Sequence, residues 1–91
     1  MATLIKKDGF SVRIRSNDHL PSHVHVFKAG GEAKINLGSE RERPSLVGLW
    51  NMSAKDATRA LKLVIAHQVE LLEKWREIHG ESESDGGNLK G

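Results

Sequence analysis

The period of the hydrophobic pattern changes once along this chain, from two residues in the first half to three or four in the second. Polar and apolar residues alternate over 11–15 and again over 23–27, which predicts two strands. The Asp8-Gly9 pair predicts a hairpin turn that joins 4–7 to 10–15. A second turn over 29–31 leads into a strand at 32–37, and 45–49 is expected to form one more short strand.

The second half predicts one long amphipathic helix over 54–79. Ser53 followed by Asp56 resembles a capping box at its start, and Gly80 is the glycine expected just beyond its end. At about 1.5 Å per residue this helix would be about 39 Å long. Its inward stripe consists of Ala57, Leu61, Val64, Ile65, Gln68, Leu72 and Trp75, and is widened by Ala60, Leu71 and Ile78. The expected fold class is α+β, in two layers, with an antiparallel sheet of four to five strands packed on this helix.

Composition limits the chain to one small domain, which we place at residues 1–80. The chain has 91 residues and a net charge of +2, enough for a single core. The acidic, glycine-rich segment 81–91 is expected to be disordered. It carries a charge of −2, which leaves +4 on the body and favours polyanionic partners. The absence of cysteine excludes disulfides and thiol chemistry. The chain shows neither an apolar run of membrane-spanning length nor a signal peptide, so we expect a cytoplasmic protein that does not enter a membrane.

Strand alternation assigns side chains to the two faces of the sheet. The face toward the helix should receive Val12, Ile14, Val24, Val26, Ala33, Ile35 and Leu37. The opposite, open face should receive Arg13, Arg15, His23, His25, Phe27, Lys34 and Asn36, with Glu32 at a strand start. Cations, imidazoles and one aromatic ring on a single face predict a surface for phosphate or nucleic acid. The alternative is an ordinary solvated face without a ligand.

The segment 16–26 offers three chemistries, which the sequence leaves open. His23 and His25 can direct two imidazoles at one ion, with Asp18 or His19 as a third ligand, the pattern of a catalytic Zn²⁺ site. The same two histidines can act as general acid and base while Arg13, Arg15 or Lys34 stabilises phosphate charge. In the third interpretation, Asn17-Asp18 caps a turn and His19 is a structural loop residue.

The remaining aromatic and imidazole side chains are interpreted as structural. His67 and His79 lie twelve residues apart on the predicted helix, where partial burial or capping accounts for them. Trp50 and Trp75 are interpreted as core or interface anchors rather than as a stacking platform.

The run from Asn17-Asp18-His19 through Pro21 to His23-x-His25-Val26, followed by a glycine turn and a long helix, resembles a family of small bacterial proteins. That family is known as domain of unknown function 4160, and the resemblance covers residues 4–80. Its members typically carry two consecutive prolines where this chain has Pro21-Ser22. The resemblance implies a component of a toxin–antitoxin-like operon and supports Asp18, His19, His23 and His25 as a site.

These observations favour a binding module whose open sheet face binds an anionic partner, with nucleic acid as the first choice. Arg13, Arg15, Lys34 and Phe27 would contact the nucleic acid. One alternative is a ribonuclease toxin that uses His23 and His25, with or without a divalent metal bound together with Asp18. Another is a module that only docks a cognate small protein encoded by the adjacent gene. The broad apolar face of the helix is also compatible with a homodimer.

Overall fold

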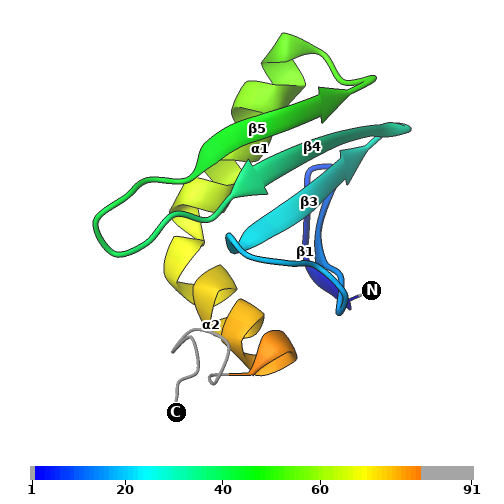
Figure 1. Ribbon diagram of the computed structural model, residues 1–91. Helices are drawn as coiled ribbons and strands as arrows, with labels where there is room; N and C mark the ends of the chain where they lie inside the picture. Colours follow the sequence, from blue (N-terminus) through cyan, green and yellow to red (C-terminus); the bar gives the residue numbers. More distant parts are fainter. Residues whose placement is uncertain (1, 81–91) are drawn as a thin grey trace.

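Five strands form one antiparallel sheet in which each strand pairs with its neighbour along the chain (Figure 1). The computed structural model describes residues 2–80, so the tail at 81–91 lies outside the described part. The strands are β1 (Ala2–Lys7), β2 (Phe10–Ile14), β3 (His23–Lys28), β4 (Gly31–Asn36) and β5 (Ser45–Trp50). The helices α1 (Ala54–Ala66) and α2 (Gln68–His79) follow. The predicted α+β class and the fifth strand are confirmed. Neither described helix is long and apolar enough to cross a membrane.

Both predicted hairpin turns form, and each requires a left-handed backbone at two consecutive positions. Asp8 and Gly9 have φ values of 53° and 85°, while Ala29 and Gly30 have 50° and 82°. Two consecutive positive φ values are those of a type I′ turn, which matches the twist of the strands it joins. The turns set the register of their hairpins, β1–β2 and β3–β4.

The core lies between the helices and the face of the sheet that alternation assigned to it. All seven predicted inward side chains are fully buried, and Phe10 joins them. α1 packs against β4 and β5. The helices contribute Ala60, Val64, Leu71 and Trp75 to the same cluster. The face assignment, on which the candidate site depends, is therefore confirmed for the core side.

The long helix predicted over 54–79 is divided in two at His67. The backbone of His67 (φ −119°, ψ 21°) is not helical, and its N–H bonds to the carbonyl of Val64, three residues back. The imidazole of His67 lies 2.8 Å from the carboxylate of Glu70 at the start of α2. The predicted N-terminus is correct, because Ser53 accepts a hydrogen bond from the Asp56 N–H at 3.1 Å. The division lets α2 follow a direction different from that of α1 (Figure 1).

The first residue of α2, Gln68, holds the long loop between β4 and β5. Its amide nitrogen lies 2.7, 2.9 and 2.8 Å from the carbonyl oxygens of Leu37, Ser39 and Glu42, which share its two N–H groups. These three residues lie outside the strands, so their carbonyl groups receive no hydrogen bonds from a neighbouring strand. The Gln68 side chain donates to them instead.

Candidate metal and anion site

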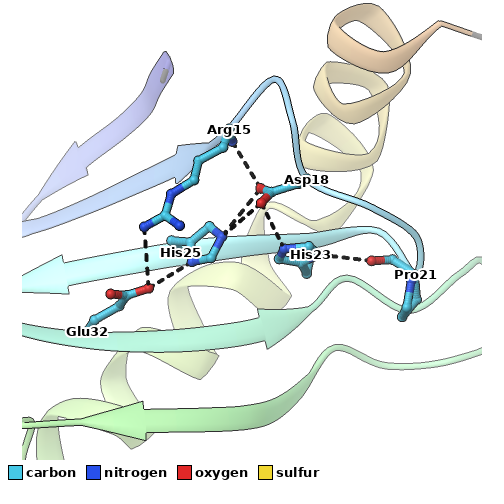
Figure 2. Close-up of polar contacts among 6 residues, drawn as sticks. All are labelled: Arg15, Asp18, Pro21, His23, His25 and Glu32. Atoms are coloured by element: carbon cyan, nitrogen blue, oxygen red, sulfur yellow. Dashed lines mark hydrogen bonds and ion pairs between the residues drawn. The ribbon is translucent and has the colours of Figure 1, made fainter.

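Asp18 lies in the loop between β2 and β3 and faces the imidazoles of His23 and His25 (Figure 2). The loop is held in place because the N–H of Arg15 donates to Asp18 Oδ2 at 3.0 Å. Asp18 Oδ1 is 3.4 Å from Nε2 of His23 and also 3.4 Å from Nε2 of His25. Asp18 Oδ2 is 3.3 Å from Nε2 of His25. One ligand atom from each of the three side chains falls within a 4.8 Å cluster.

The two histidines are buried, which differs from the open face that the alternation predicted. Each residue is only 5% exposed. The loop that carries Asp18 lies beside them, and at the end of the sheet His23 contacts Trp75 of α2, with ring centroids 5.4 Å apart. Alternation correctly assigns the side on which a residue lies, but it does not show that a loop will cover that side.

The second nitrogen of each ring has a partner that accepts a hydrogen bond. Nδ1 of His23 lies 2.9 Å from the carbonyl oxygen of Pro21. Nδ1 of His25 lies 2.8 Å from Oε2 of Glu32. Since both partners are acceptors, both Nδ1 atoms carry the proton and donate it. The Nε2 atoms of both rings lie beside one carboxylate, that of Asp18.

The pKa of Asp18 lies below its usual value. Burial raises this pKa, but the hydrogen bond from the Arg15 N–H and the charges of His23 and His25 outweigh the burial and lower it. Asp18 is thus a carboxylate at neutral pH, as a metal ligand or a partner of a cation must be.

A cavity of about 540 Å³ opens over the site, between the loop and the outer sides of β4 and β5. His23 and His25 form part of its wall, so the buried imidazoles remain accessible from one side. The lining also includes the carboxylate of Asp18 and three apolar residues, Leu20, Pro21 and Val47. Its other side chains are polar or cationic: Arg15, Asn17, His19, Lys34 and Asn36. The arrangement can hold a cation at the histidines and an anion above it.

Of the predicted anion-binding residues, Arg15 and Lys34 line this cavity, whereas Arg13 and Phe27 do not. Arg15 is also 4.0 Å from the carboxylate of Glu32. Arg13 instead lies over the ring of Phe27, 4.7 Å from its centroid, and covers a ring that was expected to face a ligand. His19 is exposed on the loop and lines the cavity as well.

Sequence reasoning placed Glu32 on the correct face without assigning it a role. Its carboxylate links Arg15 to His25. The pairing of Phe27 with Glu32 across the β3–β4 hairpin was readable from the turn. Because diagonal neighbours on one face lie within reach of long side chains, that register could have predicted the contact with His25.

No curated protein and no solved structure matches this chain. Residues 9–76 match the family described as a domain of unknown function, DUF4160. The match spans the sheet from the second strand onward, the whole Asp18–His25 segment and most of both helices. The chain therefore belongs to the DUF4160 family.

Proposed function

We propose that this chain binds Zn²⁺ through Asp18, His23 and His25 and uses it to cleave phosphodiester bonds in RNA. The observation that carries the proposal is the convergence of the Nε2 atoms of His23 and His25 on the carboxylate of Asp18, while each Nδ1 atom has its own acceptor. This arrangement requires a cation beside the carboxylate, which is either a proton on each Nε2 atom or one metal ion between them.

The distances favour a metal ion over protons as that cation. A charge-assisted N–H···O bond is about 2.7–2.9 Å long, whereas the Nε2 to Asp18 distances are 3.3–3.4 Å. Ligands about 2.0–2.1 Å from a tetrahedral Zn²⁺ lie about 3.3–3.4 Å from one another. Asp18 Oδ1 therefore lies from each Nε2 atom at the distance between two corners of such a tetrahedron, and the three ligand atoms lie within 4.8 Å of one another.

The partners of the Nδ1 atoms support the same interpretation. Histidines that bind metals donate their other N–H to a carboxylate or a backbone carbonyl, which fixes the ring and increases its basicity. Glu32 and the Pro21 carbonyl occupy these positions here. Two imidazoles and one carboxylate are the protein ligands of several catalytic Zn²⁺ sites, and the same set also binds non-haem Fe²⁺.

Three protein ligands leave a fourth coordination position, which would face the cavity. A Zn²⁺ ion held by Asp18, His23 and His25 would supply hydroxide at neutral pH, because the ion lowers the pKa of a bound water to about 7. Hydrolysis would form one bond from the water oxygen to phosphorus and break the bond from phosphorus to one ribose oxygen. His19, which lines the cavity, would accept the proton from the water and return it to the departing ribose oxygen. Arg15 and Lys34 hold the phosphate oxygens.

The test begins with zinc binding to protein that has been stripped with a chelator. Titration calorimetry should give one Zn²⁺ per chain, and the Asp18→Ala and His25→Gln variants should lose that binding. The matched control is His67→Gln, which removes a histidine outside the site. Because the chain has no cysteine, thiols do not contribute to the signal. Zinc uptake equal in Asp18→Ala and His67→Gln would contradict the proposal.

Cleavage is tested on a fluorogenic RNA oligonucleotide with and without EDTA. Loss of cleavage in EDTA and its return with Zn²⁺ support a metal-dependent ribonuclease. If the zinc-loaded chain binds RNA but does not cleave it, the ribonuclease interpretation is wrong and the binding-module interpretation is supported. The toxin–antitoxin-like role and the cognate partner remain predictions, for which co-expression with the adjacent gene product is the direct measurement.

A further inference from the structure

Trp50 ends β5 on the same outer face as the candidate site. It pairs with Glu32 across the β4–β5 ladder, and Glu32 in turn holds His25. The residue is 54% exposed, which differs from the core position that the sequence left open for it. Trp75, by contrast, is only 3% exposed. Trp75 therefore belongs to the core, whereas Trp50 presents its ring to solvent.

The indole of Trp50 lies back over Gly48, next to Lys34. A Cβ atom placed on Gly48 would fall 2.5 and 2.9 Å from Cη2 and Cζ3 of the Trp50 ring. The same position is 3.4 Å from Cβ of Lys34. A side chain at position 48 would collide with the ring in this position. Because Gly48 has no side chain, the indole can pack against the backbone of the sheet.

The indole lies near the cavity over the histidines, beside Lys34, which lines that cavity. Gly48 pairs with Lys34, and Lys34 pairs with His25, so the three lie in one row across the sheet. With strands about 4.8 Å apart, the Gly48 end of this row is about 10 Å from His25. The register shift in β5 also lets Val47 line the cavity beside Lys34. An exposed aromatic ring therefore adjoins a cationic cavity.

We infer that Trp50 stacks on an unpaired base of single-stranded RNA whose neighbouring phosphate lies in the cavity with Arg15 and Lys34. Aromatic side chains next to cationic grooves bind single strands in this way, since every base has a face to stack. A duplex would keep its base faces covered, which excludes it as the ligand of Trp50. This inference rests on the proposed function and names the form of RNA that the site takes.

The probe is a fluorescein-labelled octauridylate, whose binding is followed by anisotropy at low salt. Trp50→Ala should weaken binding about 5- to 150-fold, the range measured for one base–aromatic stack. Trp50→Phe should keep most of the affinity, because it retains an aromatic face. The matched control is Val69→Ala on α2, which removes an apolar side chain that is 70% exposed, and it should bind like the wild type.

Tryptophan fluorescence provides a second measurement, because the exposed Trp50 should be quenched by unlabelled octauridylate while the buried Trp75 is not. Affinity of Trp50→Ala within twofold of the wild type, or no RNA binding by the wild type, would overturn the inference. Sedimentation velocity tests whether a second copy of the chain, rather than RNA, occupies the Trp50 surface. A dimer that Trp50→Ala dissociates without any loss of RNA affinity would assign this surface to a second copy of the chain.

The same titrations separate this inference from the zinc proposal. Stacking on Trp50 is measured in EDTA as well as in Zn²⁺, and it does not require the metal. If the wild type takes up no zinc but Trp50→Ala still loses RNA affinity, the metal proposal fails and the stacking site stands. If zinc binds and Trp50→Ala does not change RNA affinity, the stacking site is wrong and the metal proposal stands.

Discussion

At the scale of single residues, the site depends on which ring nitrogen of each histidine is already engaged. His25 donates to Glu32 and His23 donates to the backbone of Pro21. These two contacts are not equivalent, because one partner is a removable side chain and the other is a carbonyl that any residue provides. For the proposed zinc site, Glu32 is therefore the residue whose replacement tests the support of His25 while Asp18, His23 and His25 stay unchanged.

Replacing this carboxylate in Glu32→Gln should weaken Zn²⁺ binding about tenfold, since outer partners of metal ligands typically contribute about 10- to 100-fold. The amide still accepts from His25 but lacks the charge that makes the imidazole more basic. Competition titration with a zinc chelator measures the change. Glu70→Gln, which alters the partner of His67 outside the site, is the control. Equal zinc affinities in the two variants would show that Glu32 does not support the ligand.

Asp18 gives a prediction for pH in the metal-free protein. Its pKa is lower in the folded chain than the ordinary value of about 3.9. A lowered carboxyl pKa adds stability above the ordinary pKa, and this contribution is lost as the pH falls through the folded value. The wild type should therefore exceed Asp18→Asn in unfolding free energy by the largest amount at neutral pH. This difference should decrease below about pH 3.9. Urea denaturation in EDTA across that range measures it, and a difference that grows as the pH falls would contradict the assignment.

At the scale of elements, the features that the sequence predicts correctly are those that depend on residues close together in the chain. Alternation over β2, β3 and β4 gave the buried face correctly, and the two glycine turns gave the pairing. β5 did not follow the rule, because a register shift opposite Lys34 and Ile35 interrupts the alternation. β5 is also an edge strand, and most of it is exposed. Gly48 is the one sign of this bulge in the sequence of β5, since a glycine inside a strand often marks a bulge. A glycine alone does not show to which face Val47 and Trp50 turn.

The break between α1 and α2 was also beyond the pattern, because neither glycine nor proline marks it. The structural reason lies in long-range contacts. Gln68 must turn toward three carbonyls of the β4–β5 loop, which a periodic count of apolar residues cannot show. In the candidate site, likewise, the histidine pair was predictable, but its burial under a loop was not.

Gln68→Glu tests this linkage, because the carboxylate has the same shape but cannot donate. It would place a negative charge against three carbonyl oxygens, and we expect a loss of about 1–3 kcal/mol in the free energy of unfolding. Chemical denaturation of the two proteins measures the loss. Gln68→Glu as stable as the wild type would show that the loop does not depend on this side chain. Glu73→Gln, an exposed change on α2, is the control.

At the scale of the whole molecule, charge gives the clearest prediction. Binding of RNA should weaken as salt rises, because each neutralised phosphate releases counterions. For single strands the slope of log affinity against log salt is about −0.7 per contact. Arg15→Gln and Lys34→Gln should each reduce the steepness of that slope by about 0.7.

Arg59→Gln on α1, away from the cavity over the histidines, serves as the control and should leave the slope unchanged. Anisotropy titrations at several salt concentrations measure all of these slopes. A slope that changes equally in the three variants would show that RNA follows the overall charge of the protein rather than this cavity.

The order of the sheet, in which every strand pairs with the next along the chain, has a consequence for folding speed. Proteins whose contacts are local in sequence reach the native state faster than those with distant strand pairings, because less loop-closure entropy is lost before contacts form. The side chains from Asp18 to Glu32 lie within a single hairpin and its preceding loop. This hairpin can therefore bring the histidines and their partners together early, before the C-terminal helices have docked.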